Sequence, residues 1–99
     1  MPPIDPATEA QDAVRRRRIL FRATHRGTYE NDLLIGNFVR NRLDRFTPEE
    51  LDALEQVMEL PDAVLADWLT GRMPIPPDVD GPMLRAMRDA ALDGEGRTL

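Results

Sequence analysis

The sequence predicts an all-α protein that folds as a compact bundle of about five short helices. Apolar residues recur at spacings of three and four along most of the chain, and no segment shows the period-two alternation of a half-buried strand. Prolines and glycines divide the chain into segments of helical length with brief connections between them. A chain of 99 residues has room for one domain.

The first predicted helix has Asp12 as its N-cap and runs to about Thr24. Residues 1–11 contain three prolines and little apolar content, so we expect them to form a disordered tail. Arginines cover most of the helix surface, and its apolar stripe consists of Ile19, Leu20 and Ala23.

Gly27 is expected to break the chain after this helix. Thr28 follows as the candidate N-cap of a second helix that extends to about Arg42. Acidic residues near its first turn, Glu30 and Asp32, suit the positive end of the helix macrodipole. The residues predicted to face the core are Leu34, Ile35, Phe38 and Val39.

The clearest local signal is Thr47-Pro48-Glu49-Glu50, which predicts the start of a third helix. Thr47 is the N-cap, Pro48 is the first helical residue and Glu50 is the third, so Thr47 and Glu50 form a capping box. Pro61 ends the helix. Its predicted core residues are Leu51, Leu54, Val57 and Met58.

A fourth helix is predicted over residues 62–70, with Gly71 as its stop signal, and a fifth over residues 82–92. Between them, proline favours an extended linker. We therefore assign a single helical domain to residues 12–92 and a frayed tail to residues 93–99. The residues predicted to be buried in the last two helices are Val64, Leu65, Trp68, Leu69, Met83, Leu84, Met87 and Ala91.

Composition excludes several classes of site. The chain has no cysteine and one histidine, which rules out disulfides, thiolate catalysis and metal sites rich in Cys or His. No acidic cluster has the glycine-centred loop that calcium favours, and no set of catalytic residues stands out, so we expect neither a metal nor an enzyme.

No stretch approaches the roughly 20 apolar residues of a membrane span. The first residues have no apolar h-region and carry acids, so we expect no signal or transit peptide and a bacterial cytoplasmic location.

The charges are strongly segregated along the chain. Residues 15–26 carry six arginines and no acid, whereas residues 47–99 carry twelve acids and four arginines, within a net charge of −5. Arg15-Arg16-Arg17-Arg18 and Arg22 have three interpretations: phosphate binding, recognition of carboxylates on a protein partner, or a solvated helix face that pairs with the acidic half of the chain.

The most informative segment is Arg26-Gly27-Thr28-Tyr29-Glu30. Gly27 permits a positive φ or a close approach of another backbone. Arg26 offers a planar donor fork for a carboxylate, phosphate or carbonyl. Glu30 accepts hydrogen bonds from a partner or from Arg26. A partner-docking point and a helix junction with a local ion pair are both compatible with this spacing.

At this segment the chain resembles the succinate dehydrogenase assembly factor family, also called FAD assembly factors or SdhE-like proteins. The resemblance covers roughly residues 15–73. It rests on motifs in the family's order, which are Arg17-Arg18-Ile19-Leu20-Phe21-Arg22, the Arg26-Gly27-x-x-Glu30 motif, Glu30-x-Asp32-x-Leu34, Phe38, Thr47-x-x-Glu50 and Asp62-x-x-Leu65-x-x-Trp68-Leu69-x-Gly71.

The resemblance implies a chaperone-like assembly factor of respiratory complex II. Such proteins bind the flavoprotein subunit of succinate dehydrogenase, and in some bacteria that of fumarate reductase, and promote covalent attachment of FAD to a histidine of that subunit. FAD belongs to the partner, and no tightly bound cofactor is expected in this chain. The implied partner-binding residues are Arg26, Gly27 and Glu30, with Asp32, Arg18 and Arg22 in support.

Two other functions stay open at this point. A small nucleic-acid-binding domain is supported by the arginines alone, and the acidic remainder of the chain argues against it. A protein–protein adaptor unrelated to flavin has the same surface requirements as an assembly factor. We expect a monomer when free, with no nucleic-acid partner and no insertion into a membrane.

Overall fold

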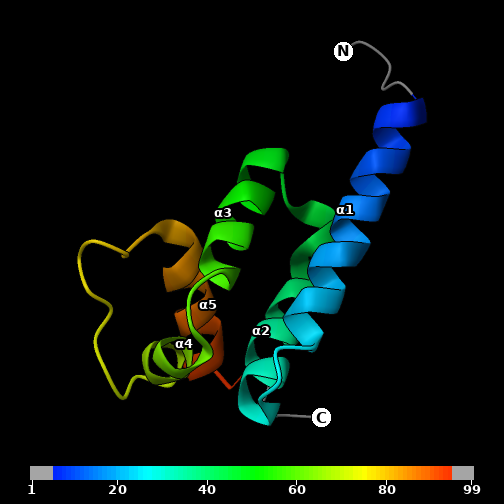
Figure 1. Cartoon of the computed structure of the whole chain (residues 1–99). Coiled ribbons are helices and arrows are strands. Elements are labelled where there is room, and N and C mark those ends of the chain that lie inside the picture. The colour runs from blue at the N-terminus through cyan, green and yellow to red at the C-terminus, as the bar shows by residue number, and fades with distance from the viewer. Residues whose placement is uncertain (1–5, 95–99) are drawn as a thin grey trace.

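Five α-helices and one short 3-10 helix form the described part of the chain, residues 6–94 of a computed structural model (Figure 1). The predicted all-α class is confirmed, and the capped third helix lies where the sequence places it. In order, the elements are α1 (Pro6–Thr24), α2 (Tyr29–Arg42), η1 (Leu43–Arg45), α3 (Pro48–Met58), α4 (Asp62–Leu69) and α5 (Pro82–Leu92).

The first helix begins earlier than predicted, at Pro6 rather than Asp12. The fixed φ of proline suits a first helical turn, and Glu9 places a negative charge beside the positive end of the helix dipole. Asp12 is therefore no cap; its carboxylate accepts a 2.7 Å hydrogen bond from Arg16 Nε one turn later. Residues 1–5 and 95–99, which complete the two predicted tails, lie outside the described residues.

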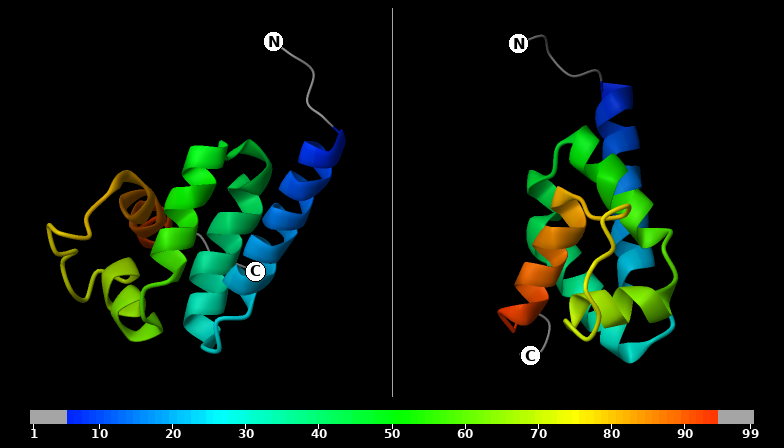
Figure 2. Two further views of the ribbon diagram at one scale, coloured as in Figure 1. Left: turned by 45° about the horizontal axis from the view of Figure 1, so that its top comes forward. Right: turned by 90° about the vertical axis from the view of Figure 1, so that its left-hand side faces the viewer.

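The second helix is the centre of the arrangement. It packs against α1, α4 and α5, while α3 packs mainly against α5. Figures 1 and 2 show α1 along one side of the molecule, with its N-terminal end projecting past the other helices, and the α4–α5 pair on the opposite side. This order places the short turn between α1 and α2 at one end of the molecule.

One apolar core joins all five helices, as the predicted stripes require. The core residue predictions hold for most positions, but Val64, Trp68, Leu20 and Met83 are only partly buried. In α4 the buried residues are Leu65 and Leu69, four positions apart, and Val64 and Trp68 each lie one position before them, at the edge of the buried face. The buried apolar residues are Ile19, Ala23, Leu34, Ile35, Phe38, Val39, Leu43, Phe46, Leu51, Leu54, Val57, Met58, Leu65, Leu69, Leu84, Met87, Ala90 and Ala91.

A buried glycine lets α1 and α2 approach closely. A Cβ on Gly36 would lie 2.9 Å from Thr24 Cγ2 and 3.5 Å from the carbonyl oxygen of Ala23. The Thr24 hydroxyl is itself hydrogen-bonded to the carbonyl of Leu20 at 2.9 Å, so its side chain is not free to rotate away. The position of the end of α1 therefore depends on the absence of a side chain at Gly36.

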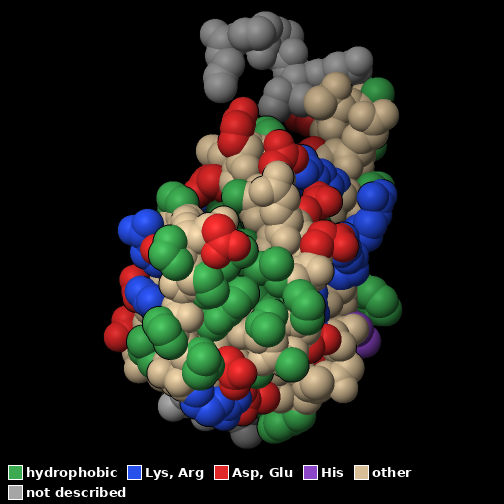
Figure 3. Space-filling view, turned by 60° about the vertical axis from the view of Figure 1, so that its left-hand side comes forward, with side chains coloured by type: hydrophobic (Ala, Val, Ile, Leu, Met, Phe, Trp, Pro, Cys, Tyr) green, Lys and Arg blue, Asp and Glu red, His purple; other side chains and the backbone are tan. Residues whose placement is uncertain are grey.

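A shallow apolar groove lies on the face formed by α3, the connection before α5, and α5 itself (Figure 3). Acidic side chains border it, and it shares no residue with the α1–α2 turn. Its apolar lining includes Ala53, Val57, Leu60, Val79, Pro82 and Met83.

The two threonine caps differ in the structure. Thr47 and Glu50 form the predicted capping box, with Thr47 Oγ1 accepting from Glu50 N at 3.1 Å and Glu50 Oε1 accepting from Thr47 N at 2.9 Å. Thr28 occupies the N-cap position of α2 but its side chain makes no capping hydrogen bond. Both N-cap positions are therefore as the sequence predicts, but only Thr47 makes a side-chain capping bond.

We expect Thr47→Ala to lower the free energy of unfolding by about 1 kcal/mol, because it removes a side-chain capping bond. Thr28→Ala is the matched control, and a change below about 0.5 kcal/mol is expected since no such bond is lost. Urea unfolding of both variants measures the difference. Equal destabilisation by the two substitutions would contradict the assigned cap geometry.

Candidate functional site

The turn between α1 and α2, residues 25–28, exposes its backbone. Gly27 adopts φ 98°, a conformation that side chains with a Cβ rarely take. A Cβ at this position would meet no atom within 4 Å. Glycine is therefore required here by backbone conformation, and the surface beside it is open to a second molecule.

Arg26 points into the protein rather than out of it. Its side chain is 10% exposed, and Nε donates to Asp62 Oδ1 at 2.8 Å. The two terminal nitrogens donate to the carbonyl oxygens of Met58 and Leu60 at the end of α3. The donor fork of Arg26 thus binds a carboxylate and two carbonyl oxygens, as its chemistry predicts, and in this structure these acceptors belong to the chain's own α3–α4 connection.

Two residues of α2 complete this arrangement. Asp32 Oδ1 accepts from the backbone N–H of Arg26 at 2.6 Å, which fixes the entry to the turn. Asn31 is 1% exposed, and its Nδ2 donates to the carbonyl and to Oδ1 of Asp62 at 2.9 and 3.2 Å. We call these four residues, Arg26, Asn31, Asp32 and Asp62, the Arg26–Asp62 network.

The sequence analysis did not single out Asn31, and it included Asp62 only as the first residue of the Asp62-x-x-Leu65 motif, without a role. Asn31 occupies a core-facing position of α2, where a polar side chain requires partners when buried. Asp62 directly follows Pro61, where an acid at the start of a helix is readily explained by the helix dipole alone. The one available signal was the polar Asn31 beside an apolar stripe.

Glu30 lies at the surface and does not pair with Arg26. Its carboxylate accepts from Arg72 at 3.3 Å, and both side chains are about half exposed. The neighbouring Tyr29 is 76% exposed. The turn thus presents Gly27, Tyr29 and Glu30 outward, while the network holds it from behind.

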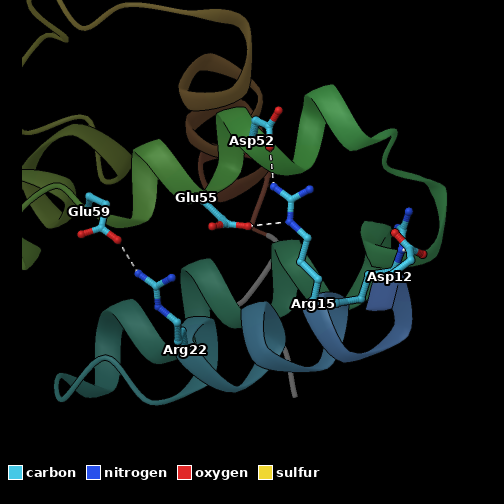
Figure 4. Close-up of polar contacts among 7 residues, drawn as sticks. Asp12, Arg15, Arg22, Asp52, Glu55 and Glu59 are labelled. Atoms are coloured by element: carbon cyan, nitrogen blue, oxygen red, sulfur yellow. Dashed lines mark hydrogen bonds and ion pairs between the residues drawn. The ribbon is translucent and has the colours of Figure 1, made fainter. Parts of the chain in front are cut away.

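Most arginines of the basic segment pair with the chain's own acids. Arg15 reaches from α1 to Asp52 and Glu55 of α3 at 2.5 and 2.7 Å, and Arg22 reaches Glu59 at 2.6 Å (Figure 4). Hydrogen bonds to Asp52 and then Glu55 raise the pKa of Arg15 above its ordinary value. The third interpretation of the basic segment, pairing with the acidic half, therefore holds for these residues.

The remaining arginines divide into two kinds. Arg16 binds Asp12 at 2.7 Å and the carbonyl oxygens of Leu43 and Phe46. Arg17 and Arg18 are exposed, and neither has a hydrogen-bond or ion-pair partner among residues 6–94. The structure thus separates Arg18 from Arg22, because only Arg18 keeps its charge unpaired.

Over the described range, no group of three or more His, Asp or Glu side chains is placed to hold a metal ion. Within the same range, no helix is both long and apolar enough to cross a membrane. At the α1–α2 turn the described residues offer an exposed backbone at Gly27 and an exposed carboxylate at Glu30, with Arg26 and Asp32 bonded behind them.

Residues 17–91 match the family model described as flavinator of succinate dehydrogenase. The chain belongs to this family. The matched residues contain the α1–α2 turn and the whole Arg26–Asp62 network. The resemblance seen in the sequence is therefore confirmed.

The chain is also similar to individual proteins that are named as assembly factors. The chain is 55% identical over 75 residues to the FAD assembly factor SdhE of Acetobacter pasteurianus, an alignment that covers 76% of this chain and 69% of the relative. It is 33% identical over 75 residues to the mitochondrial succinate dehydrogenase assembly factor 2 of Debaryomyces hansenii. It is 30% identical over 84 residues to the mitochondrial assembly factor 2-B of Drosophila ananassae.

The alignment with the Debaryomyces hansenii protein covers 76% of this chain, and that with the Drosophila ananassae protein covers 83% of it. Each covers only 52% of the mitochondrial relative. The chain thus spans about half the length of those two proteins. No solved structure gives a significant match.

Proposed function

We propose that this chain binds the flavoprotein subunit of succinate dehydrogenase and promotes covalent attachment of FAD to a histidine of that subunit. In bacteria that have one, the fumarate reductase flavoprotein is a second target. The family membership supports this proposal, and one structural observation carries the mechanism. A turn with an exposed glycine backbone and an exposed carboxylate is held by a buried ionic network.

The chain acts by binding rather than by catalysis. A small rigid protein that binds one conformation of a mobile partner shifts the partner's population toward that conformation. In the proposed complex, Gly27 allows close backbone approach and Glu30 accepts hydrogen bonds from the flavoprotein. FAD and the histidine that receives it belong to the partner, so the chain needs neither a nucleophile nor a cofactor of its own.

The motif residues have different roles in this proposal. Gly27 and Glu30 contact the flavoprotein, while Arg26 and Asp32 position the turn from inside. Arg22 positions α1 through its bond to Glu59, and Arg18 is free to meet the partner. The protein works as a monomer in the bacterial cytoplasm, with a protein rather than a nucleic acid as its target.

Complementation of a host that lacks this gene tests the proposal. We expect wild type to restore in-gel flavin fluorescence at the size of the succinate dehydrogenase flavoprotein, and Glu30→Ala to restore less than about a tenth of it, as for loss of a charge-assisted hydrogen bond at an interface. Because the Glu30–Arg72 pair is exposed, Glu30→Ala changes stability by less than about 1 kcal/mol.

The matched control is Asp44→Ala, which removes an exposed carboxylate on η1 at the opposite end of α2. It is expected to restore full fluorescence. Covalent flavin that is unchanged on deletion of the gene would refute the assembly function for this partner. Full flavin fluorescence with Glu30→Ala would be compatible with the assembly function but would contradict the proposed contact of Glu30 with the flavoprotein.

A further inference from the structure

The outward face of α1 carries a continuous stripe that the core does not use. Val14, Arg17, Arg18 and Phe21 recur at helical spacing, and His25 follows on the same side directly after the helix. Val14 is 43% exposed and Phe21 is 62% exposed. The buried residues Ile19 and Ala23 lie on the opposite side of the helix. We call these five exposed residues the outer stripe.

The charge of the outer stripe is unbalanced. Arg15 and Arg22, on the flanks of the helix, are turned toward acids of α3, as Figure 4 shows. Arg17 and Arg18 have no such partner in the described part of the chain. Among residues 6–94, two cations without a partner thus lie side by side on one helix face of a protein whose net charge is −5. Their field favours an acidic surface on whatever lies against α1.

The aromatic part of the outer stripe is ordered. The rings of Phe21 and His25 stack with centroids 4.0 Å apart and an interplanar angle of 16°. His25 Nδ1 lies 2.8 Å from the carbonyl oxygen of Phe21 and 3.0 Å from Thr24 Oγ1, which fixes the imidazole against the phenyl ring. An exposed ring held in one orientation loses little conformational entropy when a partner covers it.

The stack also connects the outer stripe to the turn. Phe21 and His25 line a small hollow together with Arg22, Arg26 and Asp62. Arg26 and Asp62 belong to the network that holds the turn, so the outer stripe and the Gly27–Glu30 surface adjoin. A partner that covers the turn therefore has α1 beside it.

We propose that the outer stripe is a second contact surface for the flavoprotein subunit, and that it binds an acidic patch of that subunit with an apolar recess for Phe21. This inference rests on the proposed function. A protein surface suits the stripe better than nucleic acid does. The two cations are flanked by exposed valine and phenylalanine, and a nucleic-acid binder needs a broader basic face.

The test is titration of the purified flavoprotein subunit with the full-length chain at several salt concentrations. We expect the double variant Arg17→Glu, Arg18→Glu to bind at least about tenfold more weakly than wild type and with a shallower salt dependence. Phe21→Ser is expected to lose about tenfold with the salt dependence unchanged. Because all three residues are exposed, the thermal midpoints should stay near that of wild type.

The matched control is Arg40→Glu with Arg45→Glu, an equal change of charge at exposed arginines of α2 and η1, whose side chains donate to Asn37 and to the carbonyl of Asn41, both in α2. Its affinity should equal that of wild type within about threefold, since these charges lie off the stripe. Wild-type affinity in the Arg17, Arg18 double variant would overturn the inference, as would an equal loss in the control.

A short DNA duplex serves as a further probe. Tight binding of the duplex that depends on Arg17 and Arg18 would also overturn the inference. Failure of wild type itself to bind the flavoprotein subunit would instead remove the proposed function on which the inference rests.

Discussion

Asp62→Ala is expected to lower the free energy of unfolding by about 3 kcal/mol. Removing one member of a buried ion pair costs about 3–5 kcal/mol because the remaining charge stays desolvated. The lower end applies here, since Asp62 keeps 32% of its side-chain exposure and Arg26 retains its two carbonyl partners. For a domain of this size the loss corresponds to a thermal midpoint lowered by roughly 12–24 °C. Differential scanning calorimetry measures it.

The same substitution should loosen the docking turn. Without the Asp62 carboxylate, Arg26 and Asn31 lose their shared acceptor, and Arg26 loses its bond to α4, whereas Asn31 keeps its bond to the main-chain carbonyl of residue 62. We therefore expect faster amide hydrogen exchange in residues 26–30 under conditions where the variant is still folded.

Glu59→Ala provides the control for Asp62→Ala. Its carboxylate also pairs with an arginine of α1, but at 71% exposure, so the expected loss is below about 1 kcal/mol. Equal thermal midpoints for the two variants would mean that the Arg26–Asp62 pair contributes no more than a surface ion pair.

Gly36→Leu is the second large effect, and we expect it to lower the free energy of unfolding by about 2 kcal/mol. A side chain at this position enters the contact between α1 and α2, where the methyl carbon of Thr24 would already lie 2.9 Å from a Cβ. Overpacking of this kind typically costs about 1–3 kcal/mol, and the upper end applies because a Cβ alone already fills the space. The gain in helix propensity from replacing glycine offsets roughly 1 kcal/mol, which leaves a net loss of about 2 kcal/mol. Urea unfolding measures the change.

Two further substitutions serve as comparisons for Gly36→Leu. Gly36→Ala is expected to cost less than Gly36→Leu, since only its Cβ meets Thr24 and the same propensity gain offsets part of that contact. Gly81→Leu adds the same side chain where a Cβ would meet no atom within 4 Å, so no packing loss is expected there. If Gly36→Leu unfolds at the same urea concentration as wild type, then α1 and α2 are not held at contact distance by this glycine.

Local signals in the sequence were enough to predict the number of helices and most of their ends. The capping box at Thr47 and the glycine stop at Gly71, which has φ 78°, are both decided by residues within one turn of each other. The start of α1 was misplaced because Pro6 reads equally well as part of a proline-rich tail or as a first helical residue.

The candidate site was predictable in part. The exposed Glu30 and the positive φ of Gly27 follow from residue type and local spacing. The direction of Arg26 does not, because its partner Asp62 is 36 positions away and is brought close only by packing. The same holds for Arg15 and Arg22, whose acceptors lie 37 or more positions further along the chain.

The 36-residue span between Arg26 and Asp62 also bears on when the docking turn takes shape. The chain is synthesised from its N-terminus, so residues 25–30 leave the ribosome well before α4 exists. Contacts between distant positions form late, since the intervening chain must first be ordered. Until residues 58–62 are in place, the guanidinium of Arg26 lacks the acceptors that hold it in the folded chain. Binding competence therefore develops together with the complete fold, and the turn recruits its partner only from a finished molecule.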